Sequence, residues 1–347
     1  MVGEDDGTDP VHYEFEHAII ATGSRLVEIP GFKFDGDSVL SSRGALKLDA
    51  IPESVVVVGA GYIGMELSMV LAKLRVNVTV IEMLDEILPG YESDLTRPVR
   101  ERAEELDIDY SFGESAADWT ETSNGIVVKT KTVDGSESTY EVTKTIVAVG
   151  RTPVTDTLNL SAIGLEPDDR GFLETDNTAR IDLDHVFAIG DVAGEPMLAH
   201  TASADSTVAV EIIDGQPACL DSRTIPAAVF IHPEIATVGM TESMAEEADF
   251  DPVVGKFPLR LERSSTDYGP FWGIRPSRGG RRHRIRSRGA DSRSRGLGTG
   301  RRTRPRDRDG ATLEDVATTI HTHPTLSEGV REATEHALGH AIHTLDR

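Results

Sequence analysis

A glycine-rich hexapeptide between two strand-like runs is the part of this 347-residue sequence whose residue types and spacing point most directly to chemistry. Val55–Val58 is an unbroken β-branched run, typical of a strand buried on both faces of a parallel sheet. Gly59–Gly64, with the sequence GAGYIG, follows it, and apolar residues at helical spacing lead to a second strand that ends at Glu82. Glycines at such a turn let a pyrophosphate approach backbone N–H groups at a helix N-terminus. An acid about 20 residues further on can bind both hydroxyls of a ribose.

This order of strand, glycines, helix, strand and acid predicts a dinucleotide site that prefers NAD to NADP. A lone GxGxxG would also be compatible with a simple glycine-rich turn, but here the flanking elements occur in the order that the site needs. The residues expected at the site are Gly59, Gly61, Tyr62, Ile63, Gly64 and Glu82.

A histidine and a carboxylate near the end of the chain are the second combination that could do chemistry. His321–Glu328 reads HTHPTLSE, with His323 and Glu328 as the candidate pair. An imidazole titrates near neutral pH and can accept a thiol proton, and a carboxylate can fix its tautomer and stabilise its charged form. Two structural alternatives stay open. Thr325–Glu328 has the spacing of a helix capping box, and His323 before Pro324 could be only a turn residue.

The composition is that of a strongly acidic chain with one cysteine. The formal charge of −24 argues against a nucleic-acid-binding surface and for a highly solvated one. The single Cys219 excludes an internal disulfide framework and fits a reducing cytosol. No apolar run is long enough to span a bilayer, and the acidic N-terminus resembles neither a secretory signal nor a transit peptide. We therefore expect a cytoplasmic protein without membrane contact, and the acid excess resembles that of proteins from high-salt organisms.

One segment breaks this acidic pattern. Residues 260–308 hold 16 of the 35 basic residues, all of them arginine, and only 4 of the 59 acids. Beyond residue 275 neither helical nor strand periodicity survives, so little apolar burial would offset the entropy of ordering the backbone. One interpretation is a basic arm that binds nucleic acid. The other, which we favour, is out-of-frame translation of GC-rich coding sequence, because ordered patterning stops near Leu259 and resumes at Gly310.

The remaining patterns predict an α/β protein of two or three domains. Strands are recognised by β-branched runs, helices by apolar residues at helical spacing, and turns by glycine and proline. The expected elements are a hairpin-like stretch and buried strand within Val11–Ser24, a helix around Asp94–Leu106, strands at Ile126–Thr132 and Tyr140–Val149 joined by a turn at Asp134-Gly135, a strand, glycine and acid at Val186–Asp191, a helix from Met197 to about Ile213, short strands after Thr224, and two helices within Leu313–His343.

Together these motifs resemble the pyridine nucleotide-disulfide oxidoreductases, and within them most closely the dihydrolipoyl dehydrogenases. The likeness covers the chain except residues 1–9 and 260–309, and as an ordered set the motifs are highly specific. They are Ala21–Ser24 (ATGS), Gly59–Gly64 with Glu66 and Glu82, Gly150–Pro153 (GRTP), Ile189–Asp191 (IGD), Met197–His200 (MLAH) and His321–Glu328.

The resemblance implies an FAD-binding domain interrupted by an inserted NAD-binding domain and followed by an interface domain that forms a homodimer. The corresponding fold class is α/β: a Rossmann-like NAD domain inserted in a partial FAD domain, then an α+β interface (dimerisation) domain. We expect residues 1–45 and 151–219 in the partial FAD domain, 46–150 in the NAD domain and 220–347 in the interface domain, of which 260–309 is expected to be aberrant or disordered.

By the same likeness, further residues would contact the two cofactors. Asp191 would bind the ribityl chain of the flavin, Gly150 would lie near NAD, and Glu66 would lie near the flavin and face a lysine that this chain lacks at any matching position. Taken alone, Asp191 is more typical of a helix cap and Arg151 of a surface ion pair. The residues implied at the flavin site are Thr22, Gly23, Ser24, Glu66, Asp191, Met197, Leu198, Ala199 and His200.

The activity implied by the resemblance is oxidation of protein-bound dihydrolipoamide to lipoamide through a cysteine pair and FAD, with NAD as acceptor. His323 would be the base that reaches the disulfide of the partner subunit, and Glu328 would orient it. The implied partner is a lipoyl-bearing acyltransferase of 2-oxoacid dehydrogenase complexes, or the glycine cleavage system, while nucleic acid is not an expected partner.

Departures from the family pattern limit this expectation. The chain begins after the point where the family's first GxGxxG, for the ADP part of FAD, should stand; it lacks the cysteine pair, and Thr201 stands where lysine is usual. Because dithiol electrons cannot reach a flavin without a disulfide, we expect a truncated and frameshifted chain with an incomplete FAD site, inactive alone. Another flavin disulfide reductase, of the glutathione or mercuric type, stays open, although Glu82 in place of an arginine speaks against an NADP user. A non-enzymatic NAD-binding remnant is the other alternative.

Overall fold

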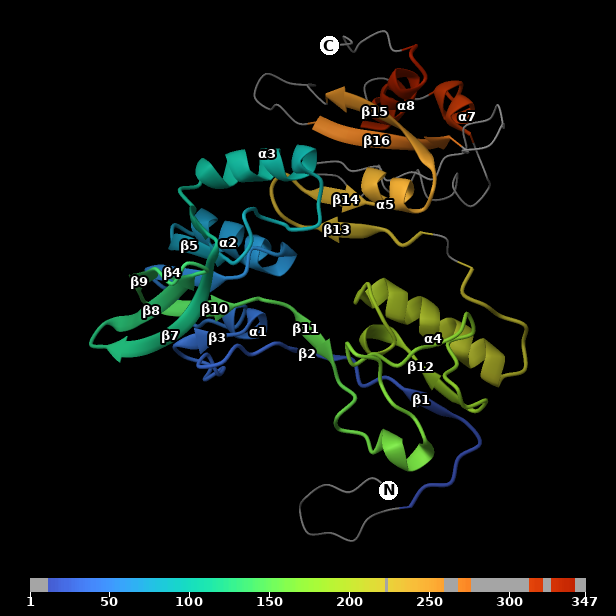
Figure 1. Cartoon of the computed structure of the whole chain (residues 1–347), viewed down its shortest axis with the longest axis horizontal. Helices are drawn as coiled ribbons and strands as arrows, with labels where there is room; N and C mark the ends of the chain where they lie inside the picture. Colours follow the sequence, from blue (N-terminus) through green and yellow to red (C-terminus); the bar gives the residue numbers. More distant parts are fainter. Residues whose placement is uncertain (1–11, 222–223, 259–267, 276–311, 321–325, 341–347) are drawn as a thin grey trace. The chain divides into compact units, whose positions relative to one another are not determined.

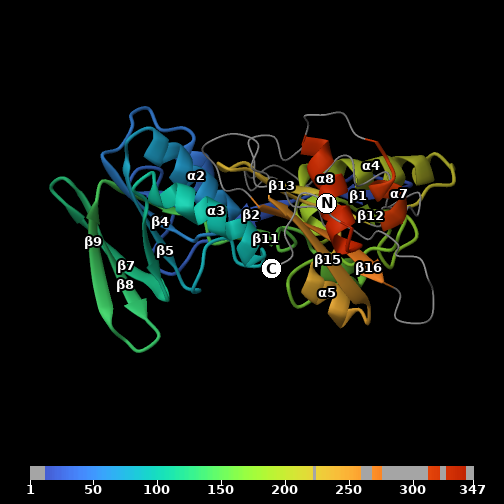
Figure 2. The same cartoon turned by 90° about the horizontal axis from the view of Figure 1, so that it is seen from above.

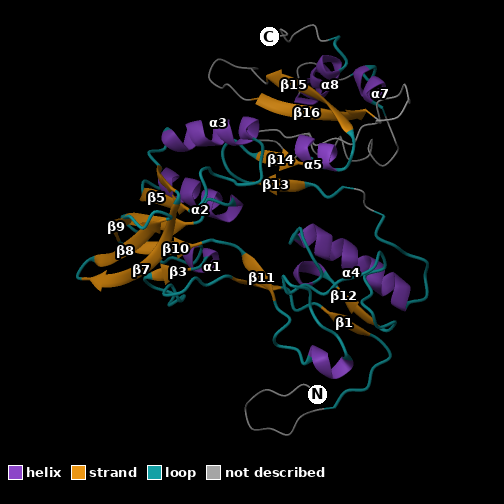
Figure 3. Cartoon of the chain, viewed as in Figure 1, coloured by secondary structure: helices purple, strands orange, loops and turns teal. Residues whose placement is uncertain are grey.

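The computed structural model describes residues 12–221, 224–258, 268–275, 312–320 and 326–340. Within them, helices and strands alternate in the mixed α/β arrangement that the sequence predicts (Figures 1 and 3). The chain divides into two compact units: unit 1 is Met1–Leu26 with Arg151–Asp221, and unit 2 is Val27–Gly150 with Ser222–Arg347. Among the described helices, none has the length and apolar character needed to cross a membrane.

A five-stranded parallel sheet forms the centre of unit 2, in the order β3-β10-β4-β5-β6. All of its pairings are parallel, so the carboxyl ends of the strands meet at one edge, where ligands bind in open α/β sheets. Its strands and the helices between them are β3 (Val39–Leu40), α1 (Ser42–Ala45), β4 (Ser54–Val58), α2 (Tyr62–Lys73), β5 (Asn77–Glu82), α3 (Ser93–Glu104), β6 (Asp109–Phe112) and β10 (Lys144–Val147).

Alternate residues of β4 face two different cores, which explains the unbroken valine run. Val55 and Val57 pack with apolar residues of α2 and α3, whereas Val56 and Val58 pack with residues of a second sheet. Figure 2 shows this second sheet beside β4 and β5. It is antiparallel, in the order β7-β8-β9, and consists of β7 (Glu114–Thr122), β8 (Gly125–Thr132) and β9 (Glu137–Val142).

Further elements of unit 2 follow residue 224. The β13–β14 hairpin buries Val229, Ile231 and Ile235 in the same core as α2 and α3. β15 and β16 pair antiparallel along their whole lengths, and α8 packs on β15. These elements are β13 (Ala227–Val229), β14 (Ile235–Thr237), α5 (Glu242–Glu247), β15 (Asp251–Pro258), β16 (Tyr268–Arg275), α7 (Leu313–Ala317) and α8 (Leu326–Ala337).

The described part of unit 1 contains two short strand pairs. β1 pairs with β12 in parallel, and β2 pairs with β11 in antiparallel orientation. Phe187 of β12 packs with Ala209 of α4, so the turn after β12 lies against that helix. The elements are β1 (Ala18–Ile20), β2 (Ser24–Leu26), β11 (Arg151–Pro153), the 3-10 helices η1 (Leu160–Ile163) and η2 (Gly190–Val192), β12 (Val186–Ala188) and α4 (Ala199–Ile213).

The elements around the glycine loop occur where the sequence predicts them. β4 ends at Val58, α2 begins at Tyr62 and β5 ends at Glu82. The predicted hairpin around Asp134-Gly135 is also confirmed, because β8 and β9 pair on either side of it. The predictions of α3, α4, the short strands β13 and β14, and two helices near the C-terminus are confirmed as well.

The prediction of one strand over Tyr140–Val149 is wrong. β9 ends at Val142 in the antiparallel sheet, and β10 begins at Lys144 in the parallel sheet. Thr143, between them, is fixed to the start of β4, since its N–H donates to Ser54 Oγ at 3.1 Å. The strand-like composition of residues 140–149 does not reveal that the chain passes from one sheet to the other.

Two other strand predictions also differ from the structure. β6 and β7 were not expected, because residues 109–122 are largely polar and alternate only weakly between buried and exposed positions. Within Val11–Ser24 the structure has no hairpin among the described residues. Instead, β1 is a three-residue strand that pairs with β12, much later in the chain. The central residue of β1, Ile19, is 39% exposed, so β1 is not the buried strand that was predicted.

The compact units also begin at other residues than the expected domains. The NAD domain was expected to begin at residue 46, but β3 pairs with β10 inside the parallel sheet, and unit 2 begins at Val27. Phe32, Val39 and Leu40 are buried in its cores. Within 260–309, expected to be aberrant or disordered, β16 is a strand paired with β15, and the rest of that range lies outside the described residues.

A buried carboxylate links the antiparallel sheet to the end of β6. Glu114 is 9% exposed and accepts hydrogen bonds from the hydroxyls of Thr130 (2.5 Å) and Ser138 (3.2 Å). The Tyr140 hydroxyl lies 3.0 Å from Glu114 Oε2 and 2.7 Å from the Ser111 hydroxyl. Burial opposes the charge, but the hydroxyl groups together outweigh it and hold the pKa of the Glu114 carboxyl below its ordinary value.

We expect Glu114→Gln to lower the free energy of unfolding by about 1–2 kcal/mol at pH 7, because a neutral amide accepts weaker hydrogen bonds from these hydroxyls. A lowered folded-state pKa contributes stability that is fully present above the unfolded value, 4.5, and is lost as the pH falls through the folded value. The two proteins should therefore converge in acid. Urea unfolding, followed by tryptophan fluorescence because Trp119 lies in β7, measures both effects. Glu121→Gln, at an exposed position of the same strand, is the control, and an equal loss there contradicts the prediction.

Candidate functional site

Two glycines bring the end of β4 against the start of α2. Gly59 has a φ of +103°, and a Cβ there would lie 2.6 Å from the carbonyl oxygen of Ala148, just beyond the neighbouring β10. A Cβ on Gly64 would overlap the carbonyl oxygen of Gly59. Both positions therefore exclude a side chain for reasons internal to the fold.

Gly61 differs from these two glycines. It is the N-cap of α2 with a φ of −66°, which other residues adopt easily, and nothing lies within 4 Å of the place its Cβ would take. The first N–H groups of a helix have no partner inside the helix and, together with the helix dipole, attract an anion. The open space at Gly61 thus fits the close approach of a phosphate group, since no packing contact within the described chain requires glycine there.

The carboxylate of Glu82 lies beside the glycine loop and is held by backbone groups. Its Oε2 accepts the N–H of Ala60 at 2.7 Å, and its Oε1 accepts the N–H of Leu84 at 3.0 Å. The structure therefore brings the predicted acid and glycines together at the carboxyl edge of the parallel sheet. Tyr62 is 40% exposed there, and Ile63 packs partly into the core.

Glu66 lies one helical turn after Tyr62 in α2, and its side chain is hydrogen-bonded to the β13–β14 hairpin. Its Oε1 accepts the N–H of Phe230 at 2.7 Å. Burial raises the pKa of the Glu66 carboxyl, and the hydrogen bond from Phe230 lowers it in part. The N–H of His232 also lies 3.3 Å from Sδ of Met69, so α2 holds the hairpin at two points. The residue implied to face a lysine thus accepts a backbone amide in this structure.

In unit 1, side chains from three separate segments form one hydrogen-bonded group. The Ser24 hydroxyl of β2 donates to Asp191 Oδ2 at 2.5 Å. Arg151 of β11 donates through Nε to Ser24 Oγ at 2.6 Å and through Nη2 to the Ser24 carbonyl at 2.7 Å. Its Nε is 3.8 Å from Asp191 Oδ2. Asp191 is not a helix cap, because the N-caps of η2 and α4 are Ile189 and Leu198.

The backbone beside Asp191 is held by a second aspartate that was not predicted. The N–H of Gly190 donates to Asp205 Oδ2 at 3.1 Å, and Asp205 of α4 is only 8% exposed. Burial raises the pKa of the Asp205 carboxyl, and the Gly190 hydrogen bond opposes this shift. The sequence does contain a pattern that could have indicated the burial of Asp205. This residue falls on the same helical face as Ala202 and Ala209, so the predicted helix carries an acid among its apolar residues.

Apart from Glu66, which lies in α2 of unit 2, the other residues implied at the flavin site lie in unit 1. Thr22 donates its hydroxyl to the carbonyl of Val154 at 2.5 Å, and Gly23 has a φ of +69°. At the start of α4, Met197 and Leu198 are half-buried, whereas Ala199 and His200 are exposed.

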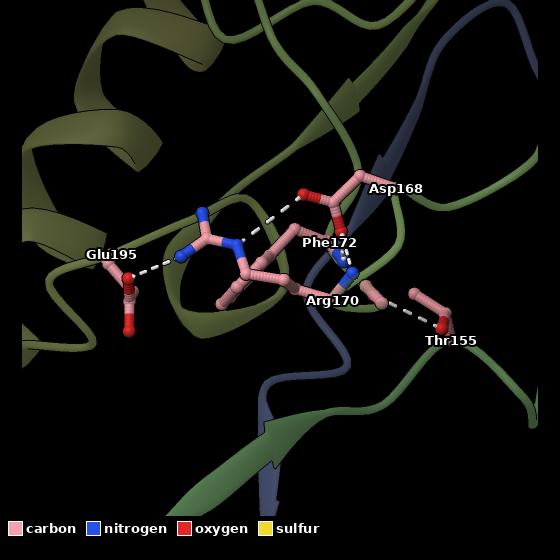
Figure 4. Close-up of polar contacts among 6 residues, drawn as sticks. Thr155, Asp168, Arg170, Phe172 and Glu195 are labelled. Carbon is pink, nitrogen blue, oxygen red and sulfur yellow. Dashed lines mark hydrogen bonds and ion pairs between the residues drawn. The ribbon is translucent and has the colours of Figure 1, made fainter.

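The segment that leads into Met197 is tied to a neighbouring turn of unit 1 (Figure 4). Arg170 lies over the ring of Phe172, and its Nη1 is 2.7 Å from Glu195 Oε2. Asp168 Oδ1 accepts the backbone N–H groups of Arg170 and Phe172 at 2.9 and 2.8 Å. Arg170 and Glu195 are largely exposed, so their ion pair contributes at most about 1 kcal/mol to stability.

The remaining predicted residues lie in other parts of the chain. Gly150 follows β10 in unit 2, and its carbonyl accepts the N–H of Val27 at 3.1 Å. His323 lies outside the described residues. Glu328 lies near the start of α8, and its side chain also lies outside the described part, so a catalytic role for the pair stays a prediction.

Sequence comparison identifies the class of protein that this fold and these sites define. Residues 2–206 match the family model described as pyridine nucleotide-disulphide oxidoreductase, and residues 225–269 match the dimerisation domain of the same proteins. The chain therefore belongs to the pyridine nucleotide-disulphide oxidoreductase family. This family uses FAD and NAD in disulfide chemistry.

Its relatives include the dihydrolipoyl dehydrogenase of Halobacterium salinarum, 54% identical over 349 residues, and that of Haloferax volcanii, 52% identical over 350 residues. Each match covers 99% of this chain and 72% of the relative. Both relatives come from halophilic archaea, in agreement with the acid excess of the sequence.

Solved structures support the same fold class. LpdA from Mycobacterium tuberculosis matches with a TM-score of 0.80 at 25% identity, covering 91% of this chain and 68% of that one. The HOCl-induced flavoprotein disulfide reductase RclA from Escherichia coli matches with a TM-score of 0.79 at 23% identity, covering 92% and 73%. The predicted α/β class, with nucleotide-binding and dimerisation domains, is confirmed by these matches.

The two kinds of glycine should respond differently to substitution. We expect Gly64→Ala to destabilise the ligand-free protein by about 1–3 kcal/mol, because α2 must shift away from Gly59 to admit the methyl group. Gly61→Ala should leave the thermal unfolding midpoint unchanged but weaken NAD binding about tenfold or more, because the methyl group would enter the open space in which we expect a phosphate. Thermal unfolding and calorimetric NAD titration of both variants test this, and unchanged NAD affinity in Gly61→Ala would contradict it.

Proposed function

We propose that residues 27–150 of this chain form an NAD-binding site of the dihydrolipoyl dehydrogenase type. The observation that carries the proposal is the joint position of Glu82 and the open N-cap Gly61 at the carboxyl edge of the parallel sheet. Gly61 and the first turn of α2 would receive the pyrophosphate, and Glu82 the ribose hydroxyls. Gly150, which follows the neighbouring β10, would lie near the nicotinamide end.

The same proposal assigns unit 1 to the flavin. Asp191 would bind the ribityl chain, Thr22, Gly23 and Ser24 would lie near it, and Met197–His200 would line the isoalloxazine. The hydrogen-bonded group of Ser24, Arg151 and Asp191 supports this, because a carboxylate held by neighbours can accept ribityl hydroxyls in one orientation. When bound, FAD supplies two-electron transfer between a dithiol and NAD.

The reaction of the complete enzyme class is oxidation of protein-bound dihydrolipoamide, with a lipoyl-bearing acyltransferase or the glycine cleavage system as partner. His323 would accept the thiol proton and Glu328 would orient it, in a cytoplasmic homodimer formed through the dimerisation domain. The names of the relatives from Halobacterium and Haloferax support this class.

The sequence of this chain holds a single cysteine, Cys219, which is exposed and lies beyond α4. One thiol cannot form the internal disulfide that accepts electrons from dihydrolipoamide. We therefore propose that this chain alone binds NAD but does not oxidise dihydrolipoamide.

Another flavin disulfide reductase is the second candidate function. Such enzymes of the NADP-using type would need a cation at the ribose 2′-phosphate, whereas the proposed site would present the carboxylate of Glu82 there. A non-enzymatic NAD-binding remnant differs from the main proposal only in lacking the flavin, which FAD titration distinguishes.

Calorimetric titration of the full chain should give an affinity for NAD at least about tenfold higher than for NADP, because the Glu82 carboxylate repels a 2′-phosphate. Glu82→Gln should narrow this ratio, since it removes the charge and keeps the size. Glu86→Gln, at an exposed position of the same loop, is the matched control and should keep the ratio. Tighter binding of NADP than of NAD by the unaltered chain would refute the role of Glu82.

The purified chain, supplied with FAD, NAD and dihydrolipoamide, should form no NADH above the rate without protein, because it cannot form the internal disulfide. Absorbance at the NADH band measures this, with an intact dihydrolipoyl dehydrogenase as the positive control. NADH formation that depends on the chain would overturn the proposed inactivity.

A further inference from the structure

Asp191 is held from two directions, and two of the residues that hold it, Arg151 and Asp205, are not among the residues assigned to the flavin. The Asp191 side chain accepts the Ser24 hydroxyl, which Arg151 holds in turn, and the N–H of the preceding residue, Gly190, donates to Asp205. These four residues come from β2, β11, η2 and α4, so they fix the relative positions of four segments within unit 1. We propose that Arg151 and Asp205 are positioning residues that preset Asp191 for the ribityl chain of the flavin.

The contact from Arg151 acts through a serine. Ser24 Oγ accepts a hydrogen bond from Arg151 Nε and donates its own hydrogen to Asp191 Oδ2. Because Nη2 of the same guanidinium also bonds the Ser24 carbonyl, Arg151 fixes both the side chain and the backbone of Ser24. A hydroxyl has only one hydrogen, so the guanidinium selects the direction in which that hydrogen is donated, towards the carboxylate.

This relay fixes the plane of the Asp191 carboxylate. Its Oδ2 is held by Ser24 and lies 3.8 Å from the guanidinium, so the orientation of the other oxygen follows. Arg151 and Asp191 are about a quarter to a third exposed, which leaves the carboxylate open to a ligand while the cation compensates its charge. A lysine at position 151 could supply the charge but not the two parallel N–H groups.

Asp205 acts on the backbone of the same turn. It accepts the N–H of Gly190, which has a φ of +71° and lies so close to α4 that a Cβ would come 3.0 Å from the Cβ of Ala202. The turn therefore packs closely on α4, and the hydrogen bond from its Gly190 N–H to Asp205 holds it there. The direction of the Asp191 side chain depends on this contact between the turn and α4.

The inference rests on the proposed flavin site, and one titration tests both. FAD is added to the full chain, and binding is followed by quenching of flavin fluorescence. Arg151→Lys and Asp205→Ala should each weaken FAD binding about tenfold, the scale of one lost charge-assisted hydrogen bond. Asp205→Asn should restore most of the affinity, because its carbonyl can still accept the Gly190 N–H. Arg25→Lys, at the neighbouring exposed arginine of β2, is the matched control and should bind as the unaltered chain does.

A double variant separates positioning from a general loss of structure. If Arg151 acts through Asp191, then Arg151→Lys combined with Asp191→Asn should bind FAD no more weakly than Asp191→Asn alone. Two results would overturn the inference and leave the proposed flavin site standing. One is a double variant whose loss of FAD affinity is the product of the two single losses, and the other is unchanged FAD affinity in Arg151→Lys. Absence of FAD binding by the unaltered chain would instead refute the proposed flavin site, and the inference with it.

Discussion

The contact between Gly64 and the carbonyl of Gly59 is the constraint on which the proposed nucleotide site depends. This contact lets α2 begin directly after β4, so the N-terminus of the helix lies at the carboxyl edge of the sheet. Because β4 is buried on both faces, between the helices and the β7–β9 sheet, the loop has a rigid base. Gly61 can then stay open to a ligand, since the neighbouring glycines already satisfy the packing.

At three places in the described part of this structure, a carboxylate side chain accepts a backbone N–H group and so connects two segments of the chain. Glu82 bonds Ala60 beside the glycine loop, Glu66 bonds Phe230 in the β13–β14 hairpin, and Asp205 bonds Gly190 before Asp191. In each case an acidic side chain fixes a segment that carries, or lies next to, a predicted site. A chain with 59 acidic residues thus uses a few of them as internal hydrogen-bond acceptors, whereas most contribute to its solvated surface.

The sequence allowed the glycine loop, both flanking strands and Glu82 to be predicted, because each has a local pattern with a physical cause. β7 forms a hairpin with β8, but its largely polar residues give no clear alternation. The exchange of sheets at Thr143 and the strand β6 could not be predicted, since they depend on pairing with more distant segments. The same holds for the group around Asp191: Ser24, Arg151 and Asp205 are far apart in sequence, and only the folded chain brings them together. Asp205 alone had a local signal, as an acid on an apolar helical face.

The pairing of β2 with β11 has an evolutionary consequence. The chain leaves unit 1 after Leu26 and returns at Arg151, and these two residues are partners in one antiparallel ladder. Directly beyond them, Val27 donates its N–H to the carbonyl of Gly150. The two ends of residues 27–150 are therefore adjacent, so an exchange of this segment would leave the β2–β11 ladder intact, but its core would still have to fit the β13–β14 hairpin. Recombination at this one ladder could exchange the proposed nucleotide site, provided that the new segment keeps the surface of α2 that packs against the hairpin.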